Sequence, residues 1–266
     1  MTEGGQEFTV RLRVGDAGVG VLEWSGRAQQ PVVDQAVSLA TDDALIAREL
    51  RRVEVALPSG DVVGRRALQR AGFRLEGIRR QAHALPDGTF VDVVLYARLA
   101  SDLVYGSGGF TGVMNSVLPR KRLIAHALLT DPWDRVCLLE TTFKDDWELP
   151  GGIVNPSESP RDGAVREIDE ELSLQLEVGR VLVVDWLAPY LGWEDAVELI
   201  FDAGALTPEQ VDAIVPDPVE VRAVHWLAAD KAADRMAPFA RGRLLAAVAC
   251  RVGGGTQYLE RGFPRP

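Results

Sequence analysis

Four acidic side chains stand within five residues in the second half of the chain, directly after Arg166. On a helix, Glu167, Glu170 and Glu171 lie at positions i, i+3 and i+4 and share one face. Asp169 points elsewhere. Three like charges one turn apart, near a helix end where the dipole is already negative, destabilise the helix unless a cation lies against them. Carboxylate oxygens on a rigid face suit Mg²⁺ or Mn²⁺, so the spacing predicts a divalent-metal site able to receive a phosphate substrate.

The elements that position this acidic face can also be predicted. Ser159 is a good N-cap, Pro160 suits the first helical position, and Asp162 completes a capping-box pattern. Upstream, residues 147–149 alternate as on a strand, and the Pro-Gly-Gly run at 150–152 predicts a turn. The expected order is therefore strand, glycine turn, loop and acidic helix.

The spacing across this stretch resembles the Nudix box, the signature of the Nudix hydrolases. The matching positions are Gly152, Glu158, the run from Arg166 to Glu171 with its apolar Ile168, and the closing Leu174. One position departs from the pattern, because Ser173 stands where the family has glycine. That glycine normally adopts the left-handed turn that ends the helix, so serine there costs about 1 kcal/mol or shifts the helix end. The alternative to the resemblance is a solvated acidic helix at a surface.

The resemblance implies a site and a fold. It implies metal ligation by Glu167, Glu170, Glu171 and the carbonyl of Gly151, with Mg²⁺ or Mn²⁺ as cofactor. It also implies that Arg166 holds a glutamate in place, and Glu158, eight residues upstream, can fold back to orient that arginine. The implied fold is an α/β/α sandwich with a mixed sheet. The sequence does not indicate which of these carboxylates is the general base.

A second glutamate outside the box is a candidate for catalysis. Glu220 precedes a strand that contains Trp226, and some Nudix enzymes use a glutamate from this region. The catalytic set predicted from the resemblance is therefore Glu170, Arg166, Glu158 and Glu220. His126 and His225 are expected to be strand-packing residues.

The implied reaction is metal-dependent hydrolysis of a phosphoanhydride in a nucleoside diphosphate linked to another moiety. The substrate stays open among ADP-ribose, dinucleoside polyphosphates, nucleotide sugars and nucleoside triphosphates. In the family, a proline in this region favours ADP-ribose and a tyrosine favours dinucleoside polyphosphates, but here Pro189 and Tyr190 are adjacent, so they do not distinguish the two. Trp186, Tyr190 and Trp193 are aromatic residues that can stack a base. Two other function classes are a ligand sensor without turnover and an acyltransferase.

Composition and charge set the wider frame. With 266 residues and 47% hydrophobic content, the chain is long enough for two domains with real cores. The sequence has no apolar run of 18 residues and no secretory signal pattern, and Cys137 and Cys250 make no disulfide framework. A cytoplasmic protein without membrane contact is expected. The net charge is −10, with 16 basic and 25 acidic residues in 106–266, which argues against nucleic-acid binding.

The first half of the chain resembles part of another family. Residues 67–99 resemble the C-terminal part of GNAT acetyltransferases, with a short helix at 62–72 and a hairpin at 73–99. The family's phosphate-binding loop, Q/R-x-x-G-x-G/A opening a helix, is missing, because residues 25–31 have no such glycine spacing. We therefore expect a smaller, truncated GNAT-like α+β domain without catalysis. Its open strand edge can be covered either by a second copy of the chain, which would give a homodimer, or by the Nudix domain.

These patterns divide the chain into four parts. The expected division is a GNAT-like domain at 1–103, a glycine-rich linker at 104–120, a Nudix domain at 121–252 and a loosely ordered tail at 253–266. Within the third part, strands are expected at 123–130, 135–140, 179–187, 195–203 and 223–227, and helices at 207–214 and 233–251.

Overall fold

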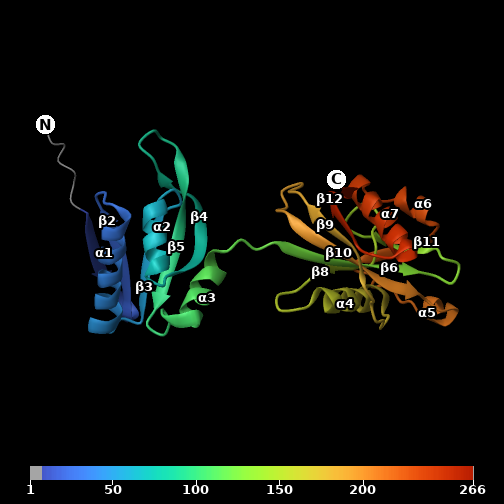
Figure 1. The fold of residues 1–266 in the computed structure, drawn as a ribbon, viewed down its shortest axis with the longest axis horizontal. Helices are drawn as coiled ribbons and strands as arrows, with labels where there is room; N and C mark the ends of the chain where they lie inside the picture. Colours follow the sequence, from blue (N-terminus) through green and yellow to red (C-terminus); the bar gives the residue numbers. More distant parts are fainter. Residues whose placement is uncertain (1–7, 266) are drawn as a thin grey trace. The chain divides into compact units, whose positions relative to one another are not determined.

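The computed structural model describes residues 8–265 as two compact units, the first ending at Pro119 and the second beginning at Arg120 (Figure 1). Residues 1–7 of the expected first domain and residue 266 of the expected tail lie outside the described residues. Each unit has a mixed sheet with its own core, so the α/β class is confirmed. Among the described residues, no helix combines the length and apolar character needed to cross a bilayer.

The first unit is a five-stranded sheet in the order β1-β2-β3-β5-β4. Only β2 and β3 are parallel, and they pair over three residues at each strand's start. The core packs α1 and α2 against the sheet through fully buried side chains such as Val37, Leu68 and Phe73. The bounds of the elements are β1 Thr9–Val14, η1 Asp16–Gly18, β2 Val19–Ser25, α1 Gln30–Asp42, η2 Asp43–Ala47, β3 Arg52–Pro58, α2 Val62–Arg70, β4 Arg74–Ala84, β5 Phe90–Leu99 and α3 Gly106–Val117. The predicted hairpin and short helix are therefore confirmed.

The segment expected to be a linker, residues 104–120, is largely helical, because α3 occupies most of it. The segment is held in place despite its glycines, because the helix packs on β4 and buries Val113. Ser116 Oγ accepts a 3.0 Å hydrogen bond from Leu75 N, and a Cβ on Gly109 would lie 2.4 Å from the Val104 carbonyl oxygen. Tertiary packing that only glycine permits therefore overrides the low helix propensity of this segment.

The second unit has an eight-stranded mixed sheet between two helical layers. The strand order is β11-β7-β6-β10-β9-β12-β13, with β8 paired to β6, and the β10–β6 and β12–β9 pairs are parallel. Figure 1 shows α4 and α5 on one face of the sheet and α6 and α7 on the other. The bounds are β6 Arg122–Thr130, β7 Val136–Thr141, β8 Gly151–Ile153, α4 Pro160–Leu172, β9 Val181–Leu187, β10 Ala196–Ala205, α5 Pro208–Asp212, β11 Val221–Leu227, α6 Ala229–Ala233, α7 Pro238–Gly253, β12 Gln257–Glu260 and β13 Phe263–Pro264.

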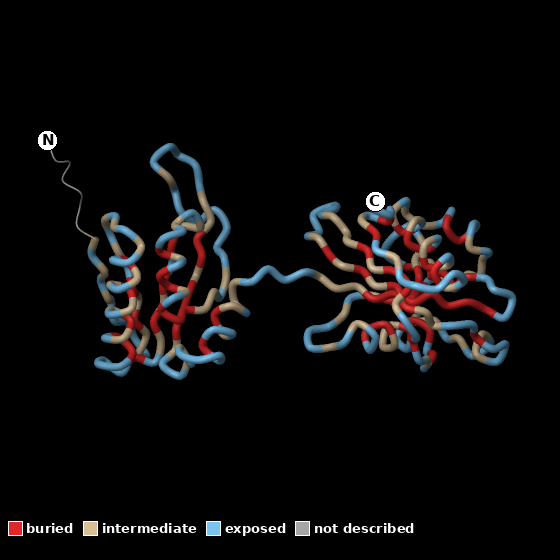
Figure 2. The backbone as a smooth tube through the Cα atoms, viewed as in Figure 1, coloured by how far each residue is buried: buried red, intermediate tan, exposed pale blue. Residues whose placement is uncertain are grey.

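The central strand β6 divides the core between the two faces. Because successive side chains point to opposite sides of a sheet, Ala125, Ala127 and Leu129 pack with Ile168 of α4, whereas Leu128 packs with α7. Figure 2 shows the buried backbone of this unit concentrated along the central strands. The same alternation directs His126 to the α7 side. One strand therefore contributes to both faces of the sheet.

The C-terminal tail is also different from the expectation of loose order. Residues 257–260 form β12, which pairs with β9, and Leu259 is fully buried. The N–H of Gly262 donates to both carboxylate oxygens of Asp185, at 3.1 and 2.9 Å. The sheet edge at β9 supplies pairing partners that the local sequence does not reveal, so the tail is part of the fold.

Candidate active site

The acidic helix α4 begins and ends where the sequence predicts. Ser159 Oγ accepts a 3.1 Å hydrogen bond from Asp162 N, and Pro160 is the first helical residue. Ser173 adopts the left-handed conformation at φ 55° and ψ 35°, and its hydroxyl donates to the Val215 carbonyl at 3.0 Å. The helix end is therefore not shifted by the replacement of the family's glycine.

The Pro-Gly-Gly run does not form the predicted turn, because Gly151 and Gly152 lie in β8 beside β6. A Cβ on Gly151, whose φ is +135°, would lie 2.6 Å from His126 Cα. A Cβ on Gly152 would lie 2.7 Å from the carboxyl carbon of Glu167. Gly151 is thus required by its close approach to the backbone of β6 and by its positive φ, whereas a side chain at Gly152 would displace the carboxylate of Glu167.

Arg166 ties the acids of the box together. Its Nε and Nη2 donate to the two carboxylate oxygens of Glu158, at 2.9 and 3.0 Å. Its Nη1 donates to Glu167 at 2.9 Å and to Glu170 at 2.7 Å. The pKa of Glu158 is lowered, chiefly by the bonds from Arg166, so Glu158 is a firm anionic anchor for the guanidinium.

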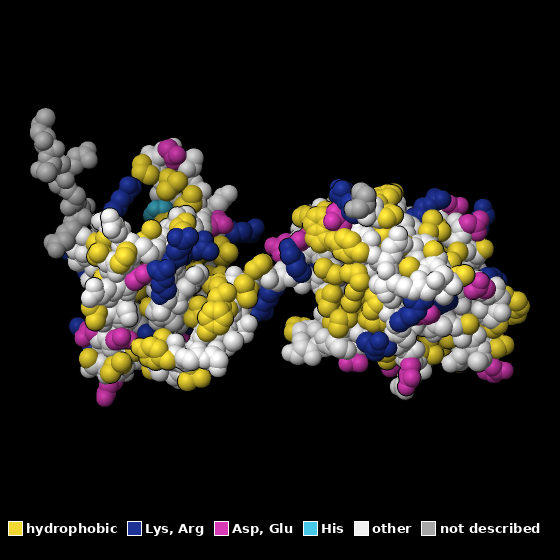
Figure 3. Space-filling model, viewed as in Figure 1, with side chains coloured by type: hydrophobic (Ala, Val, Ile, Leu, Met, Phe, Trp, Pro, Cys, Tyr) yellow, Lys and Arg dark blue, Asp and Glu magenta, His cyan; other side chains and the backbone are white. Residues whose placement is uncertain are grey.

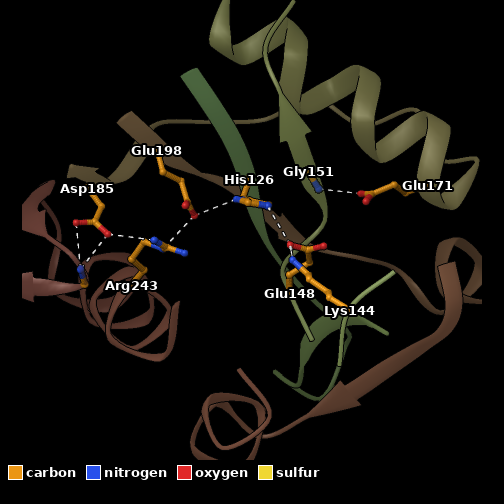
Figure 4. Close-up of polar contacts among 9 residues, drawn as sticks. His126, Lys144, Glu148, Gly151, Glu171, Asp185, Glu198 and Arg243 are labelled. Carbon is orange, nitrogen blue, oxygen red and sulfur yellow. Dashed lines mark hydrogen bonds and ion pairs between the residues drawn. The ribbon is translucent and has the colours of Figure 1, made fainter. Parts of the chain in front are cut away.

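Glu171 occupies a different environment on the same helix. Its side chain is buried, and Oε2 accepts a 2.8 Å hydrogen bond from Gly151 N (Figure 4). Burial raises its pKa to about 9, against the opposing effect of the Gly151 N–H, and the charges of Glu148, Glu167 and Glu220 raise it further. A carboxyl group in this setting is stabilised in its ionised form by a nearby cation.

Glu167 and Glu220 complete the acidic face. Burial raises the pKa of Glu167, the bond from Arg166 opposes this, and the charges of Glu170 and Glu220 add to the rise. Glu220 is exposed in the turn before β11, and its carbonyl accepts from Thr142 N at 2.9 Å. The structure thus brings the box acids and Glu220 into one electrostatic neighbourhood, with Gly151 beside them.

The donor chemistry of this face fits a divalent cation, since it consists of carboxylates crowded beside the backbone of Gly151. Within residues 8–265, no three acidic, histidine or cysteine side chains already converge on a common point as ligands. Glu167 and Glu170 are instead bonded to Arg166, which partly balances their charge.

Three polar residues next to the site were not predicted as functional: Glu148, His126 and Glu198. His126 Nδ1 lies 3.0 Å from Glu198 Oε1, and His126 Nε2 lies 4.0 Å from Glu148 Oε2. The signal that could have found Glu198 is a charged residue inside an otherwise apolar strand, because such a residue needs a buried partner. The same pattern marks Asp185 on β9.

A cavity of about 1150 Å³ lies on the α7 side of the sheet, next to His126 and Glu148. Figure 3 shows apolar side chains gathered over part of the visible face of the second unit. At the cavity, Tyr190 and Trp193 are 58% and 60% exposed, and the Arg122 guanidinium lies 4.5 Å from the centre of the Trp193 ring. The cavity is thus lined by aromatic side chains and edged by cations.

Comparison with known proteins gives one family match, to the NUDIX domain, over residues 120–248. Diphosphoinositol polyphosphate phosphohydrolase 2 of Mus musculus is 34% identical over 64 residues, which is 24% of this chain and 36% of that protein. The match therefore spans about a third of the relative's length.

Solved structures resemble the two units separately. A MutT protein from Methanosarcina mazei Go1 has a TM-score of 0.44 at 20% identity, covering 52% of this chain and 99% of that one. The ribosomal-protein-S5-alanine acetyltransferase from Vibrio fischeri has a TM-score of 0.32 at 20% identity, covering 36% and 55%.

Proposed function

The chain contains a NUDIX domain at residues 120–248, and we propose that this domain hydrolyses a phosphoanhydride bond with the help of a divalent cation. The proposed substrate is a nucleoside diphosphate linked to another moiety. The observation that carries the proposal is that the acids of α4 have different partners. Arg166 donates to both Glu167 and Glu170, whereas Glu171 is buried and bonded to the Gly151 N–H.

Mg²⁺ or Mn²⁺ would be held by Glu167, Glu170, Glu171 and the Gly151 carbonyl, and would supply charge neutralisation on the phosphates and an acidified water. Arg166 restrains the side chains of Glu167 and Glu170, and Glu158 fixes Arg166 from the opposite side. Preorganisation of this kind lowers the cost of arranging charged groups during reaction.

Glu170 and Glu220 are the proposed general-base candidates. Glu170 keeps 58% of its side chain exposed, so it can reach a water molecule while Arg166 restrains it. Glu220 is exposed on a separate turn and acts electrostatically on Glu167 and Glu171. Comparing Glu170→Gln with Glu220→Gln distinguishes the two, because loss of the base lowers kcat most.

The cavity beside His126 is the proposed site for the nucleoside part of the substrate. Its volume of about 1150 Å³ is ample for a base and a sugar. Tyr190 and Trp193 offer exposed rings for stacking.

A Mg²⁺-dependent hydrolysis screen tests the proposal. The panel contains ADP-ribose, nucleotide sugars, dinucleoside polyphosphates, nucleoside triphosphates and NADH. It also contains diphosphoinositol polyphosphates, because relatives of this domain are named for them. Turnover of a nucleotide substrate that stops in excess EDTA supports the proposal. Inactivity on every compound, or turnover that persists in EDTA, contradicts it.

A further inference from the structure

Asp185, Arg243, Glu198 and His126 form a chain of polar contacts (Figure 4), and the last three of them line the cavity. Arg243 of α7 donates from Nη1 to Asp185 Oδ2 at 3.2 Å, and its Nε lies 3.0 Å from Glu198 Oε1. The same Glu198 oxygen faces His126 Nδ1 at 3.0 Å. The pKa of the buried Glu198 is lowered, with the positive charge of Arg243 and the His126 bond opposing the effect of burial, so Glu198 is an acceptor. Four elements, β9, α7, β10 and β6, thus converge on one ionic chain.

This chain is almost wholly removed from solvent. The side chains of Asp185, Arg243, Glu198 and His126 are 0, 7, 4 and 11% exposed. Burying such groups is costly, and apolar side chains of similar volume stabilise a core at least as well. The neighbours of Glu198 on the same face of β10 are the apolar Ala196 and Ile200, both fully buried. The stability of the core is therefore a weak explanation for the presence of these polar side chains.

The chain is anchored at its far end. Asp185 accepts two hydrogen bonds from the Gly262 N–H, which fixes it to the C-terminal turn. Asp185, Arg243 and Glu198 are thus each held from two sides, and the His126 ring, which is bonded to Glu198, has a defined orientation.

At its near end the chain meets the acidic site. A Cβ on Gly151 would lie 2.9 Å from His126 Cδ2, so the ring occupies the space that a side chain at position 151 would need. Gly151 is the donor to Glu171 Oε2. His126 Nε2 also faces Glu148 at 4.0 Å, and Lys144 holds Glu148 through an ion pair. One ring therefore lies beside both the strand that holds Glu171 and an acid that acts on it.

We propose that His126 is a positioning residue for the hydrolytic site. Oriented by the buried chain Asp185–Arg243–Glu198, its ring holds Gly151 and Glu148 in place beside Glu171. The inference rests on the proposed function, because the site it positions is the proposed hydrolytic one. It also links the cavity to the acids, because His126 both lines the cavity and lies beside Gly151.

Two variants of His126 and one matched control test this role in the full chain. His126→Phe keeps a ring against Gly151 but removes both nitrogens. His126→Asn keeps an amide donor near the Nδ1 position, so it restores the bond to Glu198. The control is His225→Phe, because His225 is also a strand histidine whose nitrogen lies 3.0 Å from a glutamate, Glu140, on the same sheet.

The measurements are kcat, KM, melting temperature and the amide exchange rate of Gly151. We expect His126→Phe to lower kcat by about 10- to 100-fold, with KM changed less than about 3-fold. We expect His126→Asn to recover part of the loss and His225→Phe to stay near wild type. The Gly151 amide should exchange faster in His126→Phe than in the wild type or the control.

Three results overturn the inference. They are a wild-type kcat in His126→Phe, an equal loss in His225→Phe, and a loss of activity in both His126 variants that only follows the unfolded fraction. If the wild type hydrolyses nothing in the screen, the proposed function fails, but Gly151 exchange still tests the positioning. Unchanged exchange in a folded His126 variant then overturns it, and faster exchange supports it.

Discussion

The backbone N–H of Gly151 and the carboxylate of Glu171 are 20 residues apart and joined by a buried 2.8 Å hydrogen bond. The bond connects β8, which pairs with the central strand β6, to the last turn of the acidic helix α4. The most buried acid of the box is therefore fixed to the sheet and not to another side chain. Its ionisation becomes sensitive to any cation that enters the site.

Glu171→Gln tests the chemical role of this acid. Glutamine keeps the shape, and its amide oxygen can accept from Gly151, so the fold should be retained. Loss of the ligand charge should lower turnover at least about 100-fold. Steady-state kinetics on the best substrate, with a melting curve as the folding control, give the answer. Near-normal activity in the folded variant would show that Glu171 is not part of the reaction.

The pH dependence of stability follows from the same residue. The pKa of Glu171 rises from 4.5 to about 9 on folding, so between these values the unfolded chain has lost a proton that the folded chain keeps. The metal-free protein should lose stability as pH rises through this window, by at most about 1.4 kcal/mol per pH unit from this group. Denaturant unfolding at several pH values checks this.

Two comparisons isolate Glu171 in that experiment. Glu171→Gln should show a flatter dependence, because glutamine has no proton to lose. Saturating Mg²⁺ should also flatten the dependence and raise the melting temperature by binding the folded state. A slope equal in wild type and variant would assign the effect to other groups.

Much of this site follows from the local sequence. The N-cap Ser159 and the spacing from Arg166 to Glu171 are encoded within one helix, and the pairing of Arg166 with Glu158 needs only one loop. The glycines at 151–152 suggest a turn because glycine permits one. Their actual reason, the contact of β8 with β6 and Glu167, depends on residues far away in sequence.

The parts that the sequence does not predict depend on long-range packing. The helix α3 is rich in glycine and forms because β4 and Val104 lie against it. The strand β12 forms because β9 leaves an edge for it. The His126–Glu198 pair is separated by 72 residues and depends on the register of β6 with β10. Local secondary-structure propensity reflects none of these long-range contacts.

Arg166→Lys tests whether the guanidinium is needed to bind Glu158, Glu167 and Glu170 at the same time. Lysine keeps the charge but cannot bind Glu158 with two nitrogens while donating to Glu167 and Glu170. We expect a loss of about 1–3 kcal/mol in the free energy of unfolding, together with reduced kcat. Arg222→Lys is the control, because Arg222 is 60% exposed and bonded to Glu140 alone among the side chains of the described residues. That control should change by no more than about 0.5 kcal/mol, and an equal loss in both would refute this requirement.

Ser173 offers a test of the helix end. The left-handed conformation costs serine about 1 kcal/mol relative to glycine, while the bond to the Val215 carbonyl offsets a similar amount. Ser173→Gly should therefore be within about 0.5 kcal/mol of wild type. Ser173→Ala keeps the strained backbone and loses the bond, so it should cost about 1 kcal/mol. Chemical denaturation measures both. A stable alanine variant would show that the hydroxyl contributes nothing.

The last prediction concerns the first unit, which we expect not to bind acetyl-CoA. The segment between β2 and α1 is where a GNAT fold would present free N–H groups to a pyrophosphate. Here Pro31 removes one donor at the start of α1, and the N–H groups of Val32 and Val33 already bond to the Gln29 carbonyl, at 3.0 and 3.2 Å. Calorimetric titration of the full chain with acetyl-CoA should give no binding heat at micromolar concentrations, whereas Mg²⁺ added to the same sample should. Micromolar binding of acetyl-CoA would show that this unit anchors the ligand without that nest of donors.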